Sequence, residues 1–273
     1  MHCQLTELHY YSVAGDSYRI SDFLSIQPTI EKLLIISHTD SLSNIDPNAL
    51  PALRELSAPV QLLSTSPIPH LPCLSRLSVI LTLASLVEFV QLAGALQQIT
   101  PPRSLELCIA VNTNTDPGAI ETITIGLAYL GLAAPFITSL ELEIYQGHIQ
   151  QHELHYMLLL ALPRFPNLRT LTLMSPPPTQ NMNPRDFQMR SLSHTISLIH
   201  NTLSSLQLPI DTSFLPPALQ SEPSLTQDQP NSDALYDRSC HTKIIRAWGQ
   251  IHPSLEYVVF PFAVYNLKAF RST

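Results

Sequence analysis

Residues Phe165–Pro176, FPNLRTLTLMSP, carry the pattern that decides the fold. Leu168, Leu171 and Leu173 follow the phrase apolar-x-x-apolar-x-apolar. The last two leucines are two positions apart, which places both side chains on one face of a short β-strand. A strand with one apolar face is stable only beside a copy of itself, so the phrase predicts a unit that stacks in a repeat.

The phrase recurs along the chain. Between the middle apolar residues of successive copies the steps range from 21 to 52 residues, mostly within the span of about 20 to 50 that is typical of solenoids. Parallel strands need crossover connections, so helices are expected between the copies. The copies are Leu5/Leu8/Tyr10, Ile30/Leu33/Ile35, Leu53/Leu56/Ala58, Leu74/Leu77/Val79, Leu105/Leu107, Ile137/Leu140/Leu142, Leu168/Leu171/Leu173, Leu203/Leu206/Leu208 and Leu255/Val258/Phe260.

Helical periodicity fills most of the gaps between these strands. One expected helix, Thr82–Ile99, has Thr82 as its N-cap; its apolar face consists of Leu83, Leu86, Val87, Val90 and Ala93. Another, Gln150–Leu162, is expected to bury Leu154, Met157, Leu158 and Ala161. The remaining expected helices are Ser21–Ile26, Ala119–Leu132, Arg185–Leu203 and Asp233–Gly249.

Together these elements predict a single α/β solenoid domain over residues 1–273, with about nine parallel strands on the concave face and helices on the convex face. Residues 212–232 are rich in Pro, Ser and Gln and are predicted to form a disordered loop insertion. The uncharged run Thr122–Leu140 is interrupted by Pro135. It is interpreted as a buried helix followed by a buried strand, and not as a membrane span.

Composition argues against several classes of function. The chain has only 7 glycines and contains no phosphate-binding loop or nucleophile-elbow motif. Its net charge of -7 and scattered arginines are unlike a nucleic-acid-binding surface. Widely spaced cysteines indicate free thiols in a reducing compartment, the cytoplasm or the nucleus.

The sequence offers few candidates for metal-binding or catalytic residues. His148, His152 and His155 cluster in sequence, but on a helix they are expected to face solvent, so no metal site is predicted. Glu141 and Glu143 lie two apart on one strand without any sign of burial that would tune an acid. We therefore expect neither an enzyme nor a cofactor.

The strand residues that point away from the helices are the candidate binding surface, suited to a partner with Lys or Arg beside an apolar anchor. We expect Glu106, Glu141 and Glu143 to form an acidic spot, and Glu55 to pair with Arg76. The apolar N-terminal end of this face is assigned to Tyr11, Leu34, Ile36 and Ile80. Other members are Glu7, His9, Lys32, Ser57, Ser78, Ser104, Cys108, Ser139, Thr170, Thr172, Met174, Ser205, Gln207, Tyr257 and Val259.

The phrases PTIEKLLIIS, LPALRELSAP, LPCLSRLSVI, FPNLRTLTLMSP and HPSLEYVVFP resemble the leucine-rich-repeat portions of the F-box-like proteins of filamentous and mushroom-forming fungi. Prolines that follow the strands, such as Pro59, Pro176, Pro209 and Pro261, add to the resemblance, which covers nearly the whole chain. It implies an irregular leucine-rich-repeat solenoid that captures substrates for a cullin-type ubiquitin ligase.

An F-box pattern is not visible in the sequence. Leu50-Pro51 is the nearest match, but a repeat phrase follows it at once. A link to a cullin adaptor would therefore require an F-box elsewhere. A stand-alone leucine-rich-repeat scaffold in another complex and a receptor fragment that lacks the F-box are the alternatives.

Overall fold

The computed structural model describes residues 5–12, 20–36, 49–65, 71, 73–99, 104–113, 118–145, 149–175 and 233–268. They belong to one compact unit, formed by residues 1–177 and 232–273. The predicted helix Arg185–Leu203, the repeat phrase at Leu203/Leu206/Leu208 and the predicted insertion at 212–232 lie outside the described residues.

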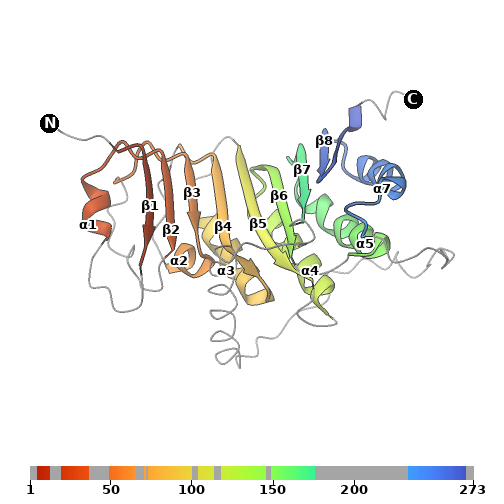
Figure 1. Cartoon of the computed structure of the whole chain (residues 1–273), viewed down its shortest axis with the longest axis horizontal. Coiled ribbons are helices and arrows are strands. Elements are labelled where there is room, and N and C mark those ends of the chain that lie inside the picture. Colours follow the sequence, from red (N-terminus) through yellow and green to blue (C-terminus); the bar gives the residue numbers. More distant parts are fainter. Residues whose placement is uncertain are drawn as a thin grey trace, which may run out of the picture. The chain divides into compact units, whose positions relative to one another are not determined.

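A single sheet of nine strands runs through the described residues, and its spatial order is the order of the sequence (Figure 1). All neighbouring pairs from β1 to β8 are parallel, which confirms the predicted parallel sheet in an α/β fold. The strands are β1 (Glu7–Tyr11), β2 (Lys32–Ile36), β3 (Glu55–Ala58), β4 (Arg76–Leu83), β5 (Leu105–Asn112), β6 (Ile137–Tyr145), β7 (Thr170–Met174), β8 (Tyr257–Phe260) and β9 (Ala263–Asn266).

The C-terminal end of the sheet differs from the prediction in two ways. First, β7 pairs directly with β8, across the undescribed residues that hold the phrase at Leu203. Second, the ninth strand is β9, which runs antiparallel to β8 after the two-residue turn Pro261–Phe262. The repeat pattern does not predict β9, because this strand carries no copy of the phrase. It joins β8 through a hairpin, which needs no crossover connection.

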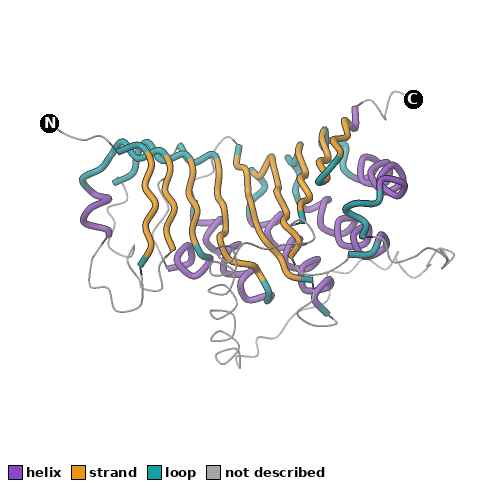
Figure 2. Tube along the Cα trace, in the orientation of Figure 1, coloured by secondary structure: helices purple, strands orange, loops and turns teal. Residues whose placement is uncertain are grey.

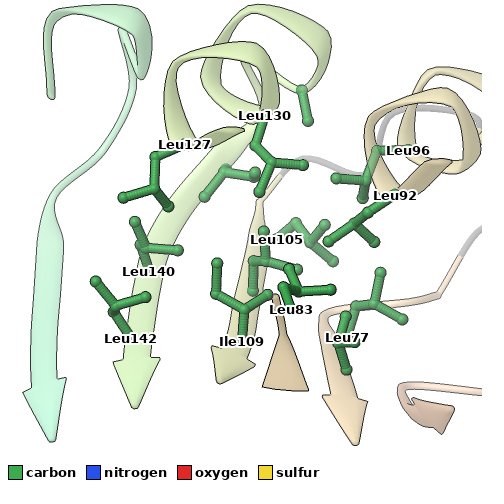
Figure 3. Packing of buried hydrophobic residues seen from close by; sticks show 14 of the residues in the cluster. Leu77, Leu83, Leu92, Leu96, Leu105, Ile109, Leu127, Leu130, Leu140 and Leu142 are labelled. Carbon is green, nitrogen blue, oxygen red and sulfur yellow. The ribbon is translucent and has the colours of Figure 1, made fainter. Parts of the chain in front are cut away.

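Helices connect most of the strands and cover one face of the sheet (Figure 2). Buried side chains of α3 and α4 meet the inward-facing residues of the central strands in one continuous core (Figure 3). The helices are α1 (Ile20–Ser25), α2 (Val60–Thr65), α3 (Leu86–Gln98), α4 (Ala119–Ala133), α5 (Gln151–Ala161) and α7 (Arg238–Ile251), with a 3-10 turn, η1, at Leu162–Arg164.

The α3 helix begins later than predicted, and it buries a different face. Its N-cap is Ser85, which forms a capping box with Glu88, whereas Thr82 and Leu83 belong to β4. Of the predicted apolar face, Ala93 is buried, but Val87 and Val90 are exposed. Apolar residues occupy both sides of this helix, so periodicity alone did not distinguish the buried side, which is formed by Phe89, Leu92, Ala93, Ala95 and Leu96.

The other helices agree more closely with the sequence. In α5 the four predicted side chains, Leu154, Met157, Leu158 and Ala161, are buried. The α7 helix begins at Arg238, five residues later than expected, because Asp237 caps it and Asp233 accepts a hydrogen bond from the Leu235 amide in the turn before it.

The run Thr122–Leu140 is divided between α4 and β6, which confirms its interpretation as a helix followed by a strand. Near the end of that helix, Gly131 packs closely against η1. A Cβ atom at this position would lie 2.6 Å from the carbonyl oxygen of Arg164, so only glycine allows this approach. Among the described helices, none combines the length and the apolar character that a bilayer crossing requires.

Candidate functional site

The face of the sheet that points away from the helices is the candidate site, and we call it the open face. Along β2, β3 and β8 its residues are partly or fully exposed, and they alternate with buried residues that point towards the helices. Most neighbouring strands are in simple register, so the residues of the open face line up in rows across the sheet. The first row is Glu7, Lys32, Glu55, Arg76, Glu106, Ser139, Thr170, Tyr257 and Asn266.

Charges alternate in sign along the first five positions of this row. Opposite charges on adjacent strands attract, so the row supports the register of the sheet. Lys32 Nζ lies 2.9 Å from Glu55 Oε1, and the hydrogen bond that Lys32 donates to Glu55 raises the pKa of Lys32. The expected pairing of Glu55 with Arg76 is wrong: these residues are in register, but Glu55 pairs with Lys32 and Arg76 turns to the other side.

Arg76 joins two of the predicted acidic residues. Its Nη1 lies 3.2 Å from Glu106 Oε1, and its Nη2 donates a hydrogen bond to Glu141 Oε2 at 3.2 Å. Glu141 is two strands away from Arg76, so the guanidinium reaches over β5 to make this contact. Two of the three predicted acidic residues, Glu106 and Glu141, therefore lie close together, and Arg76 pairs with both.

Cys108 lies between these groups on β5. Its thiol donates to Glu141, with Sγ 3.3 Å from Oε2. Burial and the charge of Glu141 raise the pKa of the Cys108 thiol to about 12. The thiol therefore keeps its proton at neutral pH and is a poor nucleophile.

Glu106, Cys108 and Glu141 are also a group of three potential metal ligands, with ligand atoms within 4.8 Å of one another, in the part of the chain that the structure describes. Two features set the chemistry of this cluster. Arg76 already pairs with both carboxylates, and the thiol is protonated. The arrangement is thus a partly exposed ion-pair cluster at neutral pH.

Glu143, the third predicted acidic residue, is separate from this cluster. It lies two positions beyond Glu141 on β6, in register with Ala110 of β5 and Met174 of β7. The strand residues of the open face contain five glutamates and two basic side chains, Lys32 and Arg76, which leaves an excess of three negative charges.

Three of the four residues assigned to the apolar N-terminal end lie close together. Tyr11 is in register with Ile36, and Leu34 is the preceding open-face residue of β2. Ile80 lies apart from them, because the four-residue strand β3 ends between β2 and β4. The register of β4 against β5 also shifts between Ser78 and Thr82, around Ile80.

A second apolar group occupies the C-terminal end of the open face. It consists of Met174, Tyr257, Val259 and Val264, from β7, β8 and β9. The sequence places the first three on this face, but it misses Val264 together with β9. The alternation Ala263-Val264-Tyr265-Asn266 after a proline-containing turn is the signal that could have identified this strand.

The histidine prediction is only partly correct. His152 is exposed, whereas His148 lies outside the described residues. His155 does not simply face solvent: its Nδ1 is buried without a hydrogen-bond partner, and burial together with the charge of Lys243 lowers its pKa. The cause is α7, which packs against α5.

The two residues expected on this face at Ser205 and Gln207 lie outside the described part of the chain. Comparison of the chain with protein-family models, with curated proteins and with solved structures gives no match. Inference about function therefore rests on the residues of the open face.

Proposed function

We propose that the chain is an irregular leucine-rich-repeat solenoid that binds a partner protein on the open face, which would be the concave face of the solenoid. Three observations support this. The strands follow the sequence order, helices cover one face, and the opposite face presents polar and apolar side chains on all nine described strands. The excess of three negative charges on that face is the observation that carries the proposal.

The proposed role is non-catalytic and needs no cofactor, nucleic acid or membrane. The resemblance of the repeat phrases favours the substrate-recognition part of a ubiquitin-ligase receptor, in the cytoplasm or nucleus. Contact with a cullin adaptor would need an F-box elsewhere. A stand-alone scaffold in another complex uses the same open face and is the second candidate.

Affinity capture with a matched control tests this proposal. The full chain, a face variant with Glu106→Gln, Glu141→Gln and Glu143→Gln, and a control variant with Asp22→Asn, Glu31→Gln and Glu121→Gln would each be used to capture proteins from a lysate of the source organism. The control removes the same number of charges at exposed positions outside the strands. Circular dichroism would first establish that the three proteins have the same fold.

We expect a set of proteins that the wild type and the control retain and the face variant loses, because only the face variant removes the charge of the open face. A cullin adaptor in that set would favour the ligase role, and its absence would favour the scaffold. Retention of the same proteins by all three baits would contradict binding through the open face.

A further inference from the structure

We infer that the binding part of the open face is its C-terminal half, and that it takes an extended segment of a partner protein with a Lys or Arg near a large apolar side chain. This inference rests on the proposed function and specifies its site and its ligand. The C-terminal surface is defined by Glu143, Met174, Tyr257, Val259 and Val264, which come from the last four strands of the sheet.

Charge distinguishes Glu143 from the other glutamates of the open face. Glu7 accepts a hydrogen bond from the His9 ring, Glu55 pairs with Lys32, and both Glu106 and Glu141 pair with Arg76. Among the residues that the structure describes, none forms an ion pair with Glu143 or donates a hydrogen bond to its carboxylate. A basic side chain of a partner can therefore pair with Glu143 without displacing an internal cation.

Apolar contact area lies directly beside this charge. Met174 is the register partner of Glu143 on the next strand. Val259 is opposite Val264 in the terminal hairpin, and this pair continues the neighbouring row of Glu141 and Thr172. Met174, Tyr257 and Val264 are exposed, Val264 to 68%. An acidic side chain that adjoins exposed Met174, with the apolar pair Val259 and Val264 one row away, matches a ligand with a cation and an apolar anchor.

The spacing of the strands gives the length of the ligand segment. Three strand spacings separate β6 from β9, about 14 Å at roughly 4.8 Å each. An extended chain advances about 3.3 Å per residue. The basic residue should therefore lie about four positions from the apolar residue that covers Val259 and Val264.

The N-terminal apolar group fits such a ligand less well. Tyr11, Leu34 and Ile36 offer apolar surface, but Lys32 and Glu55 already neutralise each other at 2.9 Å. The carboxylate of Glu7 already accepts a hydrogen bond from His9, and it lies four residues from Tyr11 along β1. This end can hold an apolar side chain without selecting for a basic one. The two ends of the open face should therefore select ligands with different sequences.

Selection from a library of random 12-residue peptides displayed on phage, with the full chain as bait, tests the inference. We expect enrichment of sequences in which Lys or Arg lies about four positions from Phe, Leu or Met. The most enriched peptide, made synthetically, should bind Glu143→Gln and Val264→Ser at least tenfold more weakly than wild type. It should bind Glu121→Gln and Tyr11→Ser as tightly as wild type.

A charge exchange makes the test specific. Glu143→Lys should abolish binding of that peptide, and replacing the basic residue of the peptide with Glu should restore it. Because Glu143 and Val264 are surface residues, equal thermal midpoints would show that the variants fold normally.

The inference is overturned if the library yields no enriched sequence, or if binding depends on Tyr11 and not on Glu143 or Val264. Dependence on Tyr11 would leave the proposed function standing, with its site at the N-terminal end. The proposed function itself fails only if, in the lysate capture, the face variant retains the same proteins as the wild type.

Discussion

The first and the last of the parallel strands, β1 and β8, are built from the same alternating pattern, but they are buried to very different degrees. In β1 the inward-facing Leu8 and Tyr10 remain partly exposed. In β8 the equivalent residues Val258 and Phe260 are 0% and 2% exposed. The comparison shows that the repeat pattern determines which face turns inward, whereas the degree of burial depends on what lies beyond the strand: β8 is flanked by β9, and β1 is the edge of the sheet.

The C-terminal end is covered by α7 together with the terminal hairpin. The ring of His241 stacks on Phe260 with centroids 3.7 Å apart. His241 Nε2 donates to the Ala234 carbonyl at 2.9 Å, and its Nδ1 lies 3.1 Å from the Tyr265 hydroxyl. The fully buried Trp248 completes this group of rings. This end is therefore closed by side chains from both α7 and β9.

The largest expected effect comes from placing the same charge at matching positions of β1 and β8. Val258→Asp would bury an unpaired carboxylate, which costs on the order of 5 kcal/mol and approaches the stability of a whole domain. Leu8→Asp should cost only about 1 to 2 kcal/mol, because the residue is partly exposed. Urea unfolding followed by circular dichroism measures both; equal losses would refute the difference between the ends.

Removal of an aromatic ring from each end should give a smaller difference in the same direction. Phe260→Ala leaves a cavity among packed rings and should lower the free energy of unfolding by about 3 to 5 kcal/mol. Tyr10→Ala, in a partly exposed position, should lower it by about 1 to 2 kcal/mol. If Tyr10→Ala proved the more damaging change in urea unfolding, the N-terminal end would be the better packed one.

Acid should weaken the C-terminal end in particular. Burial lowers the pKa of His241 below its usual 6.5, so the folded state favours the neutral ring. The stability that results is complete when the pH is above the pKa of the unfolded state. It is lost as the pH falls below that pKa and through the lower pKa of the folded state. The charges of Asp237 and Arg238 act on this pKa in opposite directions, Asp237 raising it and Arg238 lowering it.

We expect the free energy of unfolding to fall more between pH 7.5 and pH 5 for the wild type than for His241→Gln, which does not titrate. Urea titrations of both proteins at the two pH values give this double difference, in which the shared contribution of the carboxylates cancels. An identical loss in the two proteins would remove His241 as its source.

The smallest effect is expected on the open face, between the two ends. Glu141→Gln removes one of the two carboxylates paired with Arg76, and partly exposed ion pairs contribute about 1 kcal/mol or less. The urea midpoint should therefore move little, in contrast to Val258→Asp. A loss comparable with that of Phe260→Ala would mean that the charge cluster supports the sheet as strongly as the aromatic cap does.

The repeated strands could be predicted because their signal is local. Leu168, Leu171 and Leu173 each show 0% exposure, as the spacing within a single phrase requires. The same logic correctly placed Glu106 and Glu141 on the open face. A period of two residues depends only on the geometry of the strand.

The features that were missed depend on contacts between distant segments. Arg76 could pair with Glu55 or reach Glu141, and side-chain direction decides between them. The strand β9 reverses the chain instead of continuing the repeat, so the exposure of Val264 was not foreseen. His155 is partly buried because α5 packs against α7, a contact that helical periodicity does not encode.

The direct pairing of β7 with β8 has a kinetic consequence. In sequence, 82 residues separate Met174 from Tyr257, whereas 24 separate Asn112 of β5 from Ile137 of β6. Closing the longer connection costs about 1 kcal/mol more in chain entropy, so we expect β8 and α7 to join the sheet after the central strands. Trp248, the single tryptophan, lies in α7. Its fluorescence during refolding should therefore change later than the circular dichroism signal of the whole sheet, and simultaneous changes would indicate one concerted step.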